Sequence, residues 1–312
     1  MLVALLLLLL TSFRLALRHI FADLQKEIDD LAHSLRKKLN SNVKLGLESD
    51  SALRVADHPR LRQLSDFFAL SIAHNFGPQT VLTYAMRYII CATLVDTVFS
   101  KFCVDQSELG AALTTVDRRM QQWGSCIPLQ IKLLLILYRR DTGSQVVRGR
   151  WRAMAFHALR TTDSDAETTS NVATDILQQI SQLITAVTQP SEDGCQWVVD
   201  DSLPRAVSLV NTALKLHDAT QGEYVSIDYR VFLPNVFEPV QSDQVEEDEA
   251  AQKRLARSSA WPVLTTINMS GAGVLLPTSL GLHAVRVNDG ATVMSEFDPR
   301  AKVLLVVPLA QQ

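Results

Sequence analysis

Residues 17–42 have the sequence LRHIFADLQKEIDDLAHSLRKKLNSN, and this stretch decides the N-terminal part of the fold. Its apolar residues lie 4, 3, 4, 3 and 4 positions apart, which is the a/d spacing of a helix with one apolar seam. The seam consists of Leu17, Phe21, Leu24, Ile28, Leu31 and Leu35. Almost three heptads are short for a coiled coil, so two interpretations stay open. The seam mediates self-association, or it packs on the chain's own core.

The stretch that precedes the seam, residues 1–13, is the uncharged run MLVALLLLLLTSF, which ends at Arg14. No basic residue precedes the run and no small-x-small cleavage site follows it, which disfavours a cleaved signal peptide. If Arg14 and Arg18 reach the lipid interface, residues 1–21 form an uncleaved anchor with the bulk of the chain in the cytosol. The alternative is the buried start of a long helix, or a truncated piece of one, because a spanning helix needs about 20 apolar residues.

Residues 50–222 carry helical patterns separated by short breaks, and they predict a helical domain. The helix predicted over 79–103 is apolar nearly all round, which is typical of a central buried helix. Residues 161–171 hold no large apolar residue and predict a loop, and the pattern of 201–204 predicts the start of the last helix.

From residue 223 the apolar period changes to two, which predicts a strand over 225–231. Asp289 and Gly290 between two apolar runs predict a β-hairpin. The acidic run of residues 243–249, followed by the basic residues Lys253, Arg254 and Arg257, predicts an exposed helix or linker. The predicted fold is mainly α: an amphipathic helix in 1–45, a multi-helix array in 50–222 and a small β-containing part in 223–312.

The composition places the chain among intracellular globular proteins. It has 312 residues, of which 47% are hydrophobic and 20% charged, with a net charge of -3, which excludes a disordered or collagen-like protein. Four cysteines are too few for a disulfide scaffold, and no Cys/His spacing predicts a zinc site. We therefore expect reduced thiols, no metal, no cofactor, and a cytoplasmic or nuclear protein.

Two short motifs resemble catalytic motifs, but neither matches one closely. Residues 270–273, Ser-Gly-Ala-Gly, match neither a phosphate-binding loop nor a nucleophile elbow, so a turn is favoured. Cys126 follows Trp-Gly-Ser, but no base can be assigned to it from the sequence, so a buried structural thiol is favoured.

The charges divide unevenly along the chain. Residues 118–160 hold nine basic residues and one acid, whereas residues 161–250 hold three basic residues and seventeen acids. Five of the basic residues form a candidate site for nucleic acid: Arg139, Arg140, Arg148, Arg150 and Arg152. The favoured interpretation is that the acidic segment neutralises the basic one inside the fold, because the isoelectric point is about 6.2.

These observations favour a non-enzymatic interaction or scaffold protein that binds a partner protein or a second copy, or a membrane, through its N-terminal helix. A regulatory protein that binds nucleic acid through the arginines is one alternative. An enzyme whose site is assembled across the fold is the other.

Overall fold

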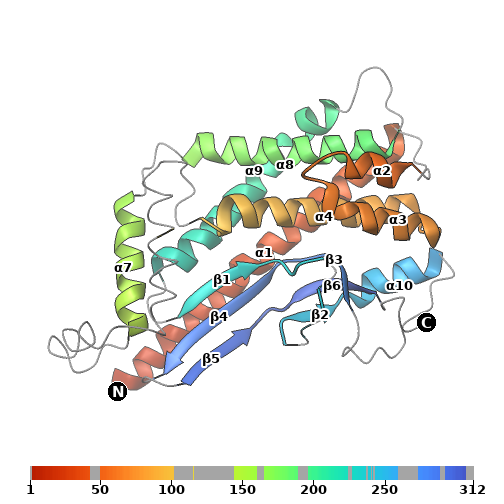
Figure 1. Cartoon of the computed structure of the whole chain (residues 1–312). Helices are drawn as coiled ribbons and strands as arrows, with labels where there is room; N and C mark the ends of the chain where they lie inside the picture. Colours follow the sequence, from red (N-terminus) through yellow and green to blue (C-terminus); the bar gives the residue numbers. More distant parts are fainter. Residues whose placement is uncertain are drawn as a thin grey trace.

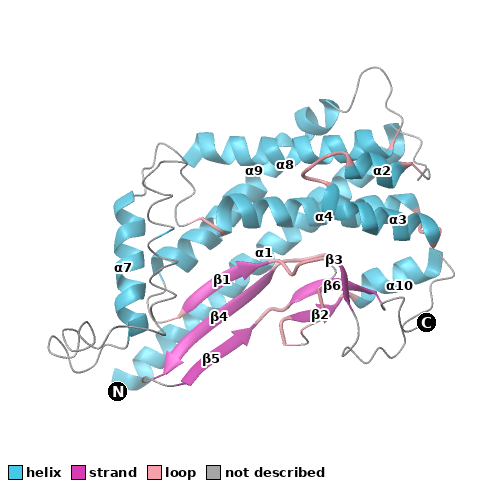
Figure 2. Cartoon of the chain, in the orientation of Figure 1, coloured by secondary structure: helices cyan, strands magenta, loops and turns pink. Residues whose placement is uncertain are grey.

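The computed structural model describes residues 2–42, 50–101, 115, 144–159, 165–188, 196–223, 227–236, 238–239, 241, 243–258, 273–288 and 292–306. Helices account for 71% of these residues, and the C-terminal region forms strands in two small sheets. Figure 2 shows the strands gathered on one side of the molecule and most of the helices on the other. The predicted fold class is confirmed.

The N-terminal helix α1 (Leu2–Asn42) is one unbroken helix that crosses the molecule behind the strands (Figure 1). Its six seam side chains are each no more than 2% exposed and belong to the main hydrophobic core. They pack against the chain's own helices α4 (Pro78–Leu94) and α9 (Gln196–Asp218). The structure therefore uses the seam for the core, and these side chains are not exposed to a second chain.

Four long helices surround the core. Helix α8 (Asp165–Val187) contacts α4 and α9, and α1 contacts the same two helices, so the four form a closed ring of neighbours. Leu24, Leu82, Leu183 and Leu209, one from each helix, are each fully buried. Burial of such side chains contributes about 1.5–3 kcal/mol each, which holds the ring together.

Shorter elements flank this ring. Their bounds are α2 (Ser51–Ala56), η1 (Arg62–Leu64), α3 (Ser65–Ala73) and α7 (Ser144–Leu159). Helices α4 and α9 both end in a π turn, at η2 (Val95–Phe99) and η3 (Ala219–Glu223). Helix α7 packs against η3, and strand β1 (Asp228–Phe232) packs against both π turns.

Two helices begin earlier than predicted. Residues 161–171 are not all loop, because α8 begins at Asp165, and α9 begins at Gln196 rather than at 201–204. The first turn of α8 carries the exposed residues Ala166 and Glu167, so this turn needs no large apolar side chain. Pro204 lies inside α9, where it removes one backbone hydrogen bond without ending the helix.

The strands form two three-stranded sheets. One sheet has the order β1-β4-β5 with β4 (Gly281–Asn288) and β5 (Thr292–Phe297), and all its pairings are antiparallel. The other has the order β2-β6-β3 with β2 (Val245–Glu247), β6 (Ala301–Val306) and β3 (Gly273–Pro277). Because Asn288 pairs with Thr292 in the β4–β5 ladder, the predicted hairpin is confirmed.

In the stretch for which an exposed helix or linker was predicted, residues 245–247 form a strand and residues 249–258 form a helix, so the helix alternative holds for the second part. Val245 is buried in β2, which runs parallel to β6. Asp248 then caps α10 (Glu249–Ser258), because its Oδ1 accepts the Ala251 N–H at 2.9 Å. The segment is acidic because its carboxylates flank a short strand and lie at the N-terminus of α10, where negative charge is favourable.

The C-terminal sheets pack on the same core as the helices. Leu275, Leu276, Leu280, Leu282 and Leu304 are buried in one cluster with the apolar side chains of α1, α4, α8 and α9. Gln25 of α1 also donates from Nε2 to the Leu280 carbonyl oxygen at 3.2 Å. Helix α1 thus has one face on the helical ring and another on the strands.

Candidate functional site

A cavity of about 630 Å³ lies where α1 meets the sheet β2-β6-β3. Its walls come from α1, α4, α10, β2, β6, the turn between β3 and β4, and the residues between β5 and β6. Nine charged side chains line it: Arg18, Arg87, Arg254, Arg300 and Lys302, with Asp29, Glu246, Asp248 and Asp298. Segments that are more than 200 residues apart in the chain therefore supply one site.

The α1 wall follows from helical spacing. Arg18, Ala22, Gln25 and Asp29 are separated by four, three and four positions, so they form one stripe on the helix. This stripe lies beside the buried seam, and Phe21 belongs to the seam and also lines the cavity. One side of α1 thus supplies the core and the adjacent side supplies polar groups.

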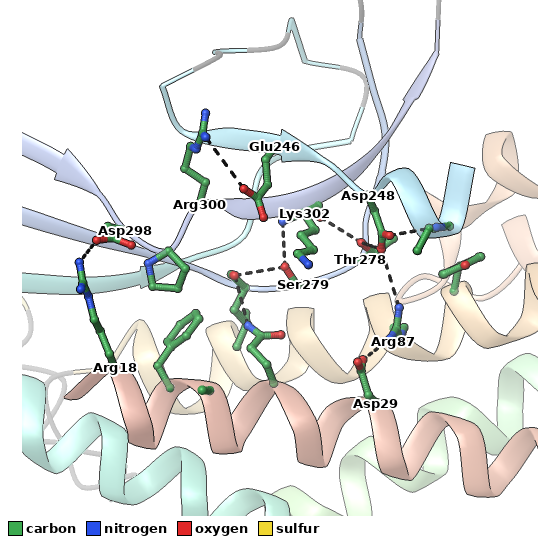
Figure 3. Close-up of a pocket in the computed structure, with 18 of the residues that line it drawn as sticks. Arg18, Asp29, Arg87, Glu246, Asp248, Thr278, Ser279, Asp298, Arg300 and Lys302 are labelled. Atoms are coloured by element: carbon green, nitrogen blue, oxygen red, sulfur yellow. Dashed lines mark hydrogen bonds and ion pairs between the residues drawn. The ribbon is translucent and has the colours of Figure 1, made fainter. Parts of the chain in front are cut away.

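Arg87 organises one end of the cavity (Figure 3). It comes from the apolar helix α4, forms an ion pair with Asp29 of α1, and lies 3.9 Å from the Asp248 carboxylate. Its guanidinium carbon also lies 5.7 Å from the centre of the Tyr84 ring. Arg87 therefore joins α1, α4 and the start of α10.

Two further ion pairs between lining residues involve the segment between β5 and β6. Arg18 of α1 pairs with Asp298, and Arg300 lies 4.0 Å from the Glu246 carboxylate of β2. Each of the four carboxylates of the cavity therefore has an arginine partner.

The hydroxyl groups of Thr278 and Ser279, in the turn after β3, form hydrogen bonds within the protein. Thr278 is buried, and its hydroxyl donates to Asp248 Oδ2 at 2.9 Å, on the carboxylate that caps α10. Ser279 Oγ accepts the Lys302 backbone N–H at 2.8 Å. These bonds fix the turn after β3 to the beginning of β6.

Burial acts on two ionisable groups of the cavity. It raises the pKa of Asp29, although the Arg87 charge and hydrogen bond oppose the rise. It also raises the pKa of Tyr84, and the nearby Asp248 charge acts in the same direction. Both shifts disfavour additional negative charge at this end of the cavity unless a cation balances it.

The cavity offers charge and hydrogen bonds. Its lining contains no histidine and no cysteine among the described residues. Within the same residues, no three His, Cys, Asp or Glu side chains gather as ligands for a metal ion. The lining supplies cations, carboxylates, hydroxyls and one amide, which can bind a polar ligand through charge and hydrogen bonds.

The arginines that were predicted to bind nucleic acid are absent from the described lining of this cavity, and those that the structure describes differ in exposure. Arg150 of α7 is exposed, whereas Arg152 is buried and donates to Asp228 of β1 at 2.6 Å. Arg139 and Arg140 lie outside the described residues, as does the side chain of Arg148. Arg152 thus serves the fold, and it joins the basic segment to the acidic one.

Of all the residues predicted for a site, the cavity contains Phe21 alone. The sequence did not predict Arg18, Arg87 or Lys302 as site residues. Arg87 carried one signal, because it is a charged residue inside the apolar helix predicted over 79–103. The motif at 270–273 and Cys126 include residues outside the described part of the chain.

Among the described residues, one helical stretch is long and apolar enough to cross a membrane, Pro78–Phe99. In this structure 67% of its most apolar 18-residue window is buried inside the protein. It includes α4, one of the four helices of the ring, and it is largely buried, as the sequence predicted for the apolar helix over 79–103.

No family model, curated protein or solved structure matches this chain.

Proposed function

We propose that this chain is a non-enzymatic interaction protein that is held at a membrane by the first turns of α1. The observation that carries the proposal is the continuity of α1 across Arg14. Beyond Arg14 the apolar residues of the helix belong to the core, beginning with Leu17. Before Arg14 the same helix continues through residues 2–13 without a charged side chain.

The ion pairs of the sheet mark the border between these two parts. Arg14 lies 2.5 Å from the Glu296 carboxylate, and Arg18 pairs with Asp298. Because these arginines are tied to the protein, the anchor that we propose comprises residues 2–13 rather than 1–21. Leu15, directly after Arg14, is 55% exposed, which leaves an apolar side chain at the border.

This arrangement supports one orientation. Residues 2–13 reach only about 18 Å, so they enter the membrane without spanning it. The basic residues that follow them favour the cytosolic surface, where the lipids are anionic. The continuous helix would then hold the charged cavity at a fixed distance from the lipid surface, because α1 is also packed into the core.

Membrane fractionation tests the proposal. The full chain should stay with membranes after washes with high salt and with carbonate. A variant with Leu6→Lys and Leu9→Lys should be soluble and should keep its helical circular dichroism, because a charge in lipid costs about 2.5–3.5 kcal/mol per residue. The matched control is Leu15→Lys, on the same helix but outside the run, which should remain with membranes.

Two results would overturn the proposal. A wild-type chain that is fully soluble has no anchor. A double variant that unfolds, while Leu15→Lys does not, would place residues 2–13 in the protein core.

A further inference from the structure

The charges of the cavity do not balance. Five cations line it against four carboxylates, and every carboxylate already has an arginine partner. Arg87 serves two of them, Asp29 and Asp248. The imbalance therefore leaves positive charge for a ligand.

Lys302 is the cation of the cavity that is best placed to bind a ligand anion. No described carboxylate lies within 4.0 Å of its ammonium group, and its side chain is exposed. In Figure 3 it lies between the Arg18–Asp298 end and the Arg87–Asp29 end, beside Ser279. A ligand at this point would meet Lys302 before either ion pair.

The backbone fixes the position of Lys302. Its N–H donates to Ser279 Oγ at 2.8 Å, and its carbonyl oxygen accepts the Thr278 N–H at 2.8 Å. The start of the side chain is thus held by the turn after β3, although the ammonium group has no partner of opposite charge among the described residues. The ammonium group itself lies at the end of a flexible four-carbon chain, so it can adjust to the position of an oxyanion.

Other groups of the cavity complete a binding site. The Arg18 Nε–H is buried and makes no hydrogen bond to a described residue, while Nη2 of the same side chain pairs with Asp298. Phe21, Leu280 and Pro299 add apolar surface to the lining. The cavity thus combines cationic donors with an apolar wall, as in sites for small molecules.

We propose that this cavity binds a small molecule that carries an oxyanion, a phosphate or a carboxylate, and that Lys302 supplies its counter-charge. Arg18 is the second donor to the oxyanion, and the apolar wall receives the remainder of the ligand. The ammonium and guanidinium groups match oxygen acceptors of either kind. Neither the ligand nor the site requires that residues 2–13 contact a membrane.

Calorimetric titration of the full chain with pyrophosphate and with citrate, at constant ionic strength, tests the proposal. At least one of the two probes should bind, and Lys302→Gln should weaken that binding by about tenfold or more, because one charged contact is lost. The matched control is Lys253→Gln, since Lys253 is exposed on α10, pairs with Glu249 and does not line the cavity. The control should bind as the wild type does.

A second measurement uses the unaltered protein. The bound probe should protect Lys302 from acetylation by acetic anhydride, as measured by peptide mass spectrometry, and should leave Lys253 reactive. The proposal fails if neither probe binds at millimolar concentration. It also fails if both lysine variants lose affinity equally, or if the probe protects both lysines to the same degree.

Discussion

Arg152 Nη1 donates to Asp228 Oδ1 at 2.6 Å, and the two side chains are only 3% and 5% exposed. The pair joins α7, in the basic segment of residues 118–160, to β1, in the acidic segment of residues 161–250. Asp228 also accepts from Arg230 through its other oxygen, at 3.2 and 2.7 Å. One buried carboxylate is thus held by two arginines where α7 and β1 meet the π turns of α4 and α9.

Arg152→Ala should lower the free energy of unfolding by about 3 kcal/mol, because it leaves Asp228 buried without its main partner. This is the low end of the usual range of about 3–5 kcal/mol, since Arg230 still pairs with Asp228. Urea unfolding measures the loss. The control is Arg150→Ala, an exposed side chain two residues away, which should change the free energy by less than about 0.5 kcal/mol.

The salt dependence of this loss separates a buried pair from surface attraction. The Arg152→Ala loss should be similar at about 0.1 M and about 1 M NaCl, because screening acts mainly on exposed charges. A loss that disappears at high salt would show that the two segments attract each other through solvent instead.

The seam of α1 provides the second prediction. Leu24→Ala and Leu31→Ala should each lower the free energy of unfolding by about 2–5 kcal/mol, because each removes a buried side chain from the core. Urea unfolding of both variants and of the exposed control Leu15→Ala measures the difference. Leu24→Lys should unfold the protein; a folded variant of lower mass in sedimentation would instead assign the seam to self-association.

The sequence predicted those elements whose signals are local. The seam residues Leu17 to Leu35 predicted a helix because every turn repeats the same apolar face, and α1 has that face in the core. Asp289 and Gly290 predicted the β4–β5 hairpin because a two-residue turn signal joins adjacent strands. The partner of the seam was not predicted, because periodicity identifies a buried face but not what covers it.

The cavity depends on distant contacts and had no local signal. Arg18 and Asp298 are 280 positions apart, and Arg87 and Asp29 are 58 apart. Strand β2 is three residues long and acidic, and its pairing with β6 is what brings Glu246 to the site. A short polar strand resembles a linker until its neighbour is known, so its sequence predicted an exposed segment.

Cys91 should be chemically inert in the folded protein. It is fully buried, and burial raises the pKa of its thiol to about 12, although a backbone hydrogen bond from Leu280 opposes the rise. At pH 8 only about one thiol in 10⁴ would be ionised, and the thiolate is the reactive form. Peptide mass spectrometry after brief iodoacetamide treatment should find Cys91 unmodified in buffer and modified in urea; rapid modification in buffer would contradict its burial.

His283 should make stability depend on pH. Its ring stacks on Phe297 with centroids 4.2 Å apart, and burial lowers its pKa below 6.5, with the Arg230 charge acting in the same direction. Asp228 and Asp243 oppose the shift. The unfolded chain therefore takes up the proton more readily, so His283 contributes stability above pH 6.5 that is lost as the pH falls through its folded-state pKa.

His283→Phe isolates this effect, because it keeps the stacked ring and removes the titrating group. Between about pH 7.5 and about pH 5, urea unfolding should show a smaller loss of stability for His283→Phe than for the wild type. The control is His19→Gln, an exposed histidine of α1, which should follow the wild-type pH dependence. Equal losses in wild type and His283→Phe would mean that protonation of His283 does not oppose folding, and that other groups cause the acid sensitivity.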